Sequence, residues 1–415
     1  MDKVMDSSKE RIEEKLICAV FLIFIIGNLL HGFVGVTTKG VWNPDDFTMR
    51  YRESKYVLSG INPFEVMKGR VEPLTNIGIL WENGGTAPWA LGIGIITNFT
   101  FLPEYYARIC ALGLYILILV ATCWSVKNYC KQHDWASSKI FIVILGICAL
   151  PGWGTGLAWL NYGCLFGGIL IIGVLNKKKY PYLFYISIGL SSLKPQLALP
   201  FYFALLYKKE WKGILIASIL PISGWILVSL LTRTPPTDFL IAMSEIGSTY
   251  DSQSIVKLIQ FIFSANFPQK VADCLSAIIC VCGICYFWKQ LKQKSIMDDL
   301  LFYSIPAVFG GMWMYTQEHD RTILGLFIIV LIPAIFCQGL KIYHKFFLCT
   351  LLFTLVYPDF FKALYCMLIN TQGIYIIYLF ALLRYFFQIF SLIIIFEYLP
   401  NTLLRMNRKD KAMCK

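Results

Sequence analysis

Several motifs that drive soluble catalysis are missing from this sequence. It has no glycine-rich loop ending in GK[ST], no HExxH, no pair of CxxC motifs and no GxSxG. These absences argue against nucleotide-driven chemistry in the cytosol. Cysteines are present, 14 of them, but most lie inside apolar runs without a paired framework. They are interpreted as small hydrophobic residues, not as disulfides or metal ligands.

Charge is also scarce. Charged residues make up 15% of the 415 residues and hydrophobic residues 57%, against about 25% and about 45–50% in soluble domains. The excess lies in long apolar runs, which include Leu16–Val36, Ile109–Val126, Ile214–Leu231 and Tyr375–Phe396. Each is close to the roughly 20 residues that cross a bilayer, where only helices satisfy the backbone. The sequence therefore predicts an all-α polytopic membrane protein, and the first run is too long for a signal peptide.

Basic residues predict which ends of the helices face the cytoplasm. The net charge of +12 does not indicate nucleic acid, because lysines flank the apolar runs in short clusters, as at 127–131, 177–179, 208–212 and 289–294. Short cytoplasmic loops are rich in Lys and Arg. If both termini are inside, about twelve spans place all of these clusters on the cytoplasmic side. The predicted spans lie near 16–36, 106–126, 139–151, 158–175, 180–192, 195–207, 212–231, 271–288, 298–316, 322–338, 345–357 and 373–396.

In this topology the chain forms one transmembrane domain with two long outer loops, 37–105 and 232–270, and a basic cytoplasmic tail, 397–415. Shorter outer loops are expected at 152–157, 193–194, 317–321 and 358–372. The apolar stretch Ala87–Leu102 is too short to cross and contains Pro88, so it is predicted to be an interfacial or re-entrant helix. A bacterial cytoplasmic membrane, with chemistry at its outer face, is the expected location.

Three outer segments carry residues suited to chemistry. Asp45 and Asp46 follow Asn-Pro near the membrane surface; such a pair can act as a general base or bind a cation, or it can be a solvated turn. Lys194, between two apolar runs, is either a snorkelling cation or a phosphate contact. His319 and Arg321 lie in a polar segment suited to binding a phosphate, or to keeping helix ends in water.

The order of these segments resembles glycosyltransferase family 87, polyprenyl-phosphate-mannose-dependent mannosyltransferases of the GT-C superfamily. The most specific element is the sequence LKPQ at 193–196. It is followed by an apolar helix and then by a loop that contains basic residues and a tryptophan. The earlier stretch WLNYGC, at 159–164, belongs to the same match. Asp46-Phe47 with the downstream GINPF, Ala87-Pro88-Trp89, and Glu318-His319-Asp320 are similar to three further family segments. The chain departs from the family at Cys164, where Gln is common, at Ala87, where Pro is common, and at Arg50, where Tyr is expected.

The resemblance implies a GT-C-like bundle and an inverting transfer of a hexose, mannose in the family, from a polyprenyl-phosphate donor to a lipid or glycan acceptor. Asp46, with Asp45 as its rival, is the expected base. His319 is expected to bind the donor phosphate, and Lys194 and Arg321 are assigned to it from their chemistry. Asn62, Tyr51 and Gln196 are the expected substrate contacts. Membrane lipids are expected partners, and the scheme requires no metal or other cofactor.

Three other functions are compatible with many spans and polar outer loops. A polysaccharide polymerase or ligase acting on undecaprenyl-linked glycans would usually carry its arginines and histidine in one large late loop, whereas the loop near His319 is short. A transporter would show internal repeats and charges near the midplane. A membrane scaffold would tolerate replacement of the acidic and histidine segments.

Overall fold

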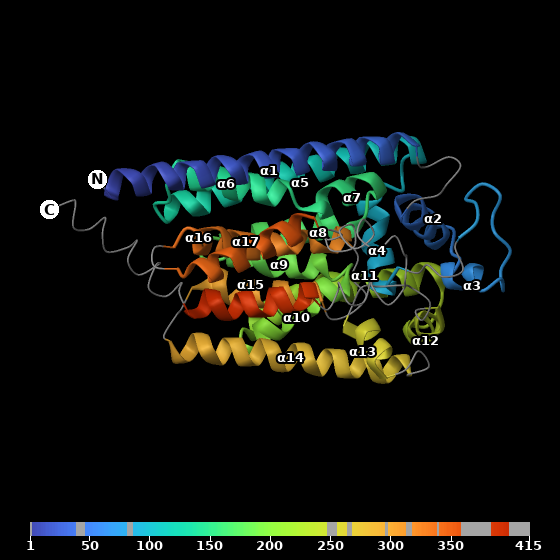
Figure 1. Cartoon of the computed structure of the whole chain (residues 1–415). Coiled ribbons are helices and arrows are strands. Elements are labelled where there is room, and N and C mark those ends of the chain that lie inside the picture. The colour runs from blue at the N-terminus through green and yellow to red at the C-terminus, as the bar shows by residue number, and fades with distance from the viewer. Residues whose placement is uncertain are drawn as a thin grey trace.

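The computed structural model describes residues 2–38, 46–80, 86–246, 255–263, 268–294, 298–312, 318–337, 340–357 and 383–397. Every regular element in these ranges is a helix, which confirms the all-α prediction. Most helices run roughly parallel to one long axis and form a bundle (Figure 1). The N-terminus lies at one end of the bundle, and the short helices α2, α3 and α12 lie at the other.

Four described helices are long and apolar enough to cross a membrane: α1 (Asp2–Thr38), α5 (Glu104–Gln132), α11 (Trp211–Thr232) and α14 (Gln269–Gln293). A fifth candidate is the bent pair of α6 (Ser137–Cys148) and α7 (Pro151–Trp159), whose axes differ by 41°. These lengths support a multi-pass membrane protein, and the count of twelve spans stays a prediction.

Other described helices lie within or close to the predicted apolar segments. They are α8 (Tyr162–Asn176), α9 (Pro181–Ser191), α10 (Pro195–Tyr207), α15 (Asp299–Gly310), α16 (Gly325–Ile335), α17 (Ile342–Val356) and a helix at 383–397. The 3₁₀ helix η1 (Glu318–Leu324) lies instead in the predicted outer loop 317–321 and the start of the next predicted span.

The prediction was wrong at one loop. Residues 152–157 were expected to be an outer loop, but they lie inside α7, and the chain turns instead at Leu160 and Asn161, within the expected span 158–175. Leu160 ends α7 in the left-handed conformation (φ 47°), and Asn161 caps α8. Hydropathy could not locate this break because the residues on both sides of it are apolar.

The two long predicted loops contain short helices. The first holds α2 (Asp46–Leu58), α3 (Pro63–Met67) and α4 (Pro88–Thr97), and the second holds α12 (Pro236–Ile246) and α13 (Ile255–Phe263). At 10 residues, α4 is too short to cross a bilayer, as predicted. It packs tightly on α11, where a Cβ at Gly92 would lie 2.2 Å from the backbone oxygen of Gly224.

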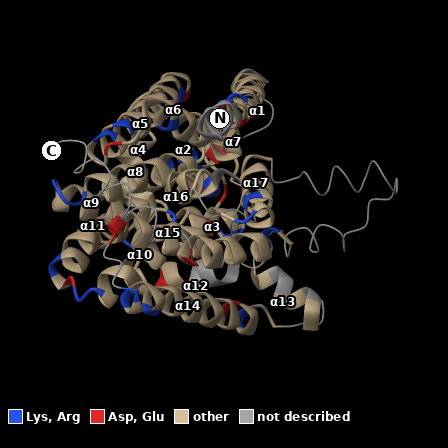
Figure 2. Cartoon of the chain, turned by 60° about the vertical axis from the view of Figure 1, so that its left-hand side comes forward, with Lys and Arg blue, Asp and Glu red and all other residues tan. Residues whose placement is uncertain are grey.

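Ion pairs connect turns and helix ends at the end of the bundle opposite α2 and α3 (Figure 1). Lys177 Nζ lies 2.6 Å from Glu210, Lys208 Nζ 2.5 Å from Asp299, and Lys345 Nζ 2.5 Å from Glu13. Figure 2 shows the charged residues mostly near helix ends and turns, with long uncharged stretches between them. This distribution is the one that a bundle immersed in hydrocarbon requires.

Candidate functional site

One face of α2 carries three charged side chains at positions i, i+4 and i+7: Asp46, Arg50 and Glu53. Residues with this spacing lie on the same side of a helix. The helix is anchored by Phe47 and Tyr51, both buried, whose rings stack with centroids 6.1 Å apart. Because the aromatic residues hold α2 against the bundle, its charged face has a defined position over the helices beneath.

Asp46 contacts the first turn of α8. Its Oδ2 accepts a hydrogen bond from the side-chain amide of Asn161. The Asn161 Oδ1 accepts at the same time from the backbone N–H of Gly163, at 2.8 Å, which caps the helix. Asp46 is half-buried, whereas Asn161 is 1% exposed. The break between α7 and α8 therefore places a polar side chain beneath the carboxylate that the sequence predicted to be the base.

A buried ion pair lies next to this contact. Lys194 Nζ, at the start of α10, is 2.9 Å from Asp320 Oδ1 in η1, and the two side chains are 7% and 0% exposed. A Cβ at Gly163 would lie 2.0 Å from the same Asp320 oxygen, so only glycine fits there. The charges of Arg50 and Asp46 also act on the Lys194 ammonium. Segments from α2, α8, α10 and η1 thus converge at one point.

Arg50 and Glu53 extend the cluster along α2. The Arg50 guanidinium lies 4.5 Å from the centre of the Tyr162 ring, and its Nη1 donates to Thr86 Oγ1 at 3.3 Å. Glu53, 3% exposed, accepts hydrogen bonds from the backbone N–H and the hydroxyl of Thr86. Burial raises the pKa of Glu53 to about 7, although those hydrogen bonds and the charge of Arg50 act in the opposite direction.

The helix α4 is fixed to the same cluster by polar contacts at both ends. At its C-terminus, Asn98 accepts from the Tyr162 hydroxyl at 2.5 Å and donates to the Arg50 carbonyl at 3.2 Å. At its N-terminus, Trp89 Nε1 donates to the Ser192 carbonyl at 2.6 Å, two residues before Lys194. These contacts make α4 a wall of the site and limit the movement of α2 relative to α8.

The other predicted site residues occupy different places. Asn62 is 8% exposed, and its Oδ1 caps α3 by accepting from the Phe64 N–H at 3.0 Å. The Tyr51 hydroxyl donates to the Leu102 carbonyl at 2.7 Å. Gln196 is buried in the first turn of α10, close in sequence to Lys194. Their assignment as substrate contacts stays a prediction.

Two predicted residues lie wholly or partly outside the part of the chain that the structure describes. Asp45 lies outside the described residues, as does the side chain of His319, whose backbone belongs to η1 beside Asp320. Arg321, also in η1, is 3% exposed. The structure thus brings Asp46, Lys194 and the segment 319–321 together at one end of α8, although the sequence places them far apart.

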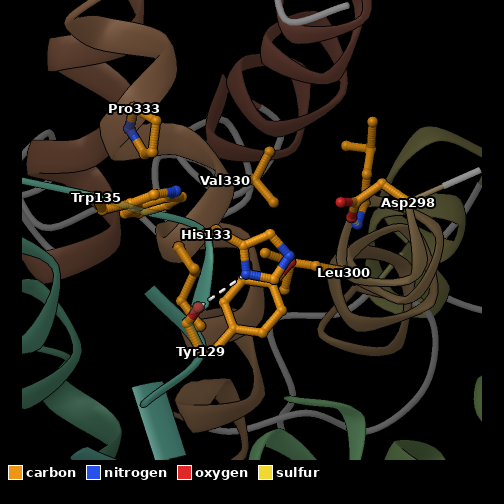
Figure 3. Close-up of a pocket in the computed structure, with 9 residues that line it drawn as sticks. Tyr129, His133, Trp135, Asp298, Leu300, Val330 and Pro333 are labelled. Carbon is orange, nitrogen blue, oxygen red and sulfur yellow. Dashed lines mark hydrogen bonds between the residues drawn. The ribbon is translucent and has the colours of Figure 1, made fainter. Parts of the chain in front are cut away.

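A separate pocket, shown in Figure 3, lies near the end of α5 that is farthest from this cluster. Tyr129, His133, Trp135 and Asp298 line it together with aliphatic residues of α15 and α16. His133 Nδ1 is 2.8 Å from the Tyr129 carbonyl oxygen, and Asp298 Oδ1 caps α15 by accepting from the Leu301 N–H at 2.9 Å. These polar groups are used in local structure, so the charged cluster at the start of α8 is the better candidate site.

Sequence reasoning assigned no role to four charged or polar members of this cluster: Arg50, Glu53, Asn161 and Asp320. The first two share a helical face with Asp46, and their spacing could have revealed them once α2 was predicted as a helix. Asn161 stood in the stretch that carried the family resemblance, but no role was assigned to it. Its contact with Asp46 joins residues 115 positions apart, which a pattern within one helix cannot predict.

Comparisons with known proteins agree with the resemblance seen in the sequence. The sequence model of glycosyltransferase family 87 matches residues 91–316, a range that includes Asn161 and Lys194 but neither Asp46 nor Asp320. A search of curated proteins finds no match.

Among solved structures, ArnT from Cupriavidus metallidurans shows a distant likeness, in its apo state and bound to undecaprenyl phosphate. Each comparison has 12% sequence identity and covers 90% of this chain and 76% of ArnT, with TM-scores of 0.41 and 0.40. The assignment to a family therefore rests on the sequence match. Because that match spans just over half of the residues, the chain belongs to glycosyltransferase family 87.

Proposed function

We propose that this membrane glycosyltransferase transfers a hexose, mannose by family expectation, from a polyprenyl-phosphate donor to a lipid-linked or glycan acceptor. The observation that carries the proposal is the convergence of Asp46, the Lys194–Asp320 pair and η1 at the start of α8. A carboxylate beside buried cations is the combination that this transfer needs. One group must take a proton from the acceptor hydroxyl, and the others must stabilise a departing phosphate.

Asp46 is the proposed general base. It is half-buried, its Oδ2 is held by Asn161, and its carboxylate lies within the electrostatic reach of Lys194 and Arg50. In a single displacement the carboxylate removes the proton from the acceptor hydroxyl. The hydroxyl oxygen attacks the anomeric carbon, the bond to the phosphate oxygen breaks, and the configuration inverts. Asp45 remains the rival for this role.

The leaving phosphate is proposed to interact with the cations around α8. Lys194 and Arg321 come from different segments and are both buried, and Arg50 adds a third cation from α2. Low effective dielectric makes such fixed charges more effective than the same charges in water. His319, beside Asp320 in η1, is proposed to contact the same phosphate. The scheme needs no metal, so chelator-treated membranes should keep their activity.

The proposed location of this reaction is the outer face of a cytoplasmic membrane. This location is supported by the two ends of α8. The cluster lies at the start of α8, and a lysine-rich turn follows its C-terminal end. A helix of this length spans about 22 Å at about 1.5 Å per residue. The positive-inside rule assigns the lysine-rich end to the cytoplasm. The polyprenyl chain would lie among the apolar helices, and the sugar would reach the aqueous side.

The test is sugar transfer in membranes that contain the protein, using radiolabelled polyprenyl-phosphate mannose and other polyprenyl-phosphate hexoses with a panel of lipid acceptors. Asp46→Ala and His319→Ala should insert normally and lose transfer by at least about a hundredfold, the usual contribution of a general base or of a fixed charge. Asp134→Asn, at an exposed aspartate near the lysine-rich end, is the matched control. Full activity of Asp46→Ala that also carries Asp45→Ala would refute the assignment of the base.

A further inference from the structure

The side chain of Asn161 is engaged on both sides, and its orientation follows from its partners. A backbone N–H can only donate, so the atom of Asn161 that faces the Gly163 N–H at 2.8 Å must be the carbonyl oxygen. The NH₂ group therefore points to Asp46 and donates to Oδ2. With 1% of the residue exposed, water cannot easily replace either contact.

We propose that Asn161 is a positioning residue that keeps the Asp46 carboxylate ionised and fixed in direction, an inference that rests on the proposed role of Asp46 as the base. A hydrogen bond donated to a carboxylate favours its ionised form. The helix cap holds the donor in place, so the carboxylate is oriented by the backbone of α8. Asn161 itself exchanges no proton with the substrate.

The surroundings of Asp46 contain other charges whose effects must be separated from that of Asn161. Within the part of the chain that the structure describes, the charged and titratable groups that share this environment include Arg50, Glu53, Tyr115, Tyr162, Lys194 and its partner Asp320, with His319 and Arg321 next to Asp320 in η1. The charges of Arg50 and Lys194 favour the ionised form of Asp46, and the charge of Glu53 opposes it. Substituting Asn161 leaves all of these groups in place, so a change in the proton affinity of Asp46 can be traced to the amide.

A purely structural role for Asn161 makes a different prediction from a positioning role. Asp and Asn are equally good N-cap residues, so Asn161→Asp keeps an oxygen for the Gly163 N–H. The same substitution replaces the NH₂ donor with a second carboxylate oxygen facing Asp46. If Asn161 only caps α8, this variant should behave as the wild type. If Asn161 positions the base, the two carboxyl groups will compete and one will hold a proton.

The experiment measures sugar transfer against pH for the wild type, Asn161→Asp and Asn161→Ser. Ser also caps a helix, but it is too short to reach Asp46 and brings no charge. We expect both variants to fold and insert, Asn161→Asp with a lower thermal stability at neutral pH because its two carboxyl groups repel. Both variants should lose at least about tenfold in kcat, with little change in KM for the donor. The acid limb of the pH profile should move to higher pH in Asn161→Asp and less in Asn161→Ser.

A matched control is available at another helix cap. Asp298→Asn exchanges the same two side chains at the start of α15, near the end of α5 that lies far from the cluster. It should leave both kcat and the pH profile unchanged. Wild-type kcat and an unshifted profile in Asn161→Asp would overturn the inference and leave the proposed function intact.

A second measurement does not depend on catalysis. Dicyclohexylcarbodiimide reacts with protonated carboxyl groups, and the modification of Asp46 can be followed by mass spectrometry of the purified protein across pH. Labelling should persist to higher pH in Asn161→Asp than in the wild type. If the wild type transferred no sugar but this shift occurred, the proposed function would fail and the positioning role would stand. Identical labelling curves would overturn the positioning role.

Discussion

Separating the structural from the catalytic role of Lys194 requires both members of its buried ion pair to be changed. At 2.9 Å, two unit charges attract by roughly 6 kcal/mol at an effective dielectric constant of about 20, and the cost of removing both from water offsets much of this. Removing one partner leaves the other charge buried and unpaired, which typically costs about 3–5 kcal/mol. Lys194→Met and Asp320→Asn should each therefore destabilise the folded protein strongly.

The double variant Lys194→Met with Asp320→Asn should recover most of that loss, because replacing both charges of a buried pair is often close to neutral. Asn is chosen because Asp320 is packed against Gly163 and a larger side chain would not fit. Thermal unfolding in detergent measures stability, and transfer from the polyprenyl-phosphate donor measures activity.

The expected result is a double variant that is nearly as stable as the wild type but inactive, since no ammonium remains to stabilise the leaving phosphate. Wild-type activity in the double variant would show that Lys194 serves only to balance Asp320. Two single variants as stable as the wild type would refute the reasoning about the buried pair itself.

Three further predictions concern other parts of the chain. The pKa of Glu53 is raised to about 7 from 4.5, so protonated Glu53 stabilises the folded protein fully below its unfolded pKa, and this stabilisation is lost as the pH rises through about 7. Thermal unfolding between about pH 5 and pH 8 should show a fall of about 3 kcal/mol in the free energy of unfolding. The Glu53→Gln variant should lack this fall. Gly163→Ala should reduce both stability and transfer, because its Cβ collides with the carboxylate of the buried pair, whereas Gly113→Ala, with no neighbouring atom within 4 Å, should be neutral in the same assays. Reporters fused after Lys131 and after Lys294 should both give cytoplasmic signals, and periplasmic signals there would reverse the proposed sidedness.

Hydropathy and charge predicted the helices well because a membrane imposes a simple rule on composition. Predicted segments such as 195–207 and 212–231 agree with α10 and α11 within a residue. The same rule failed at the turn between α7 and α8, because it measures only how apolar a segment is. A left-handed Leu160 followed by a capping Asn161 leaves no mark in such a pattern.

The candidate site was predictable only in part. The resemblance identified Asp46 as a candidate, chemistry and position identified Lys194, and the structure places the two close together. The pairing of Lys194 with Asp320, 126 residues apart, depends on how α8, α10 and η1 pack side by side. That packing is set by small residues such as Gly163, where the absence of a side chain makes room for a carboxylate. Neither charge nor hydropathy along one chain contains this information.

The break between α7 and α8 also has an electrostatic consequence. A helix that begins inside the bundle presents the positive end of its dipole there, equivalent to about half an elementary charge. Asp46 and Asp320 both lie beside that end of α8. The backbone groups at the start of α8 thus supply part of the positive charge that balances two carboxylates. Fewer charged lysine and arginine side chains are then needed in this low-dielectric environment.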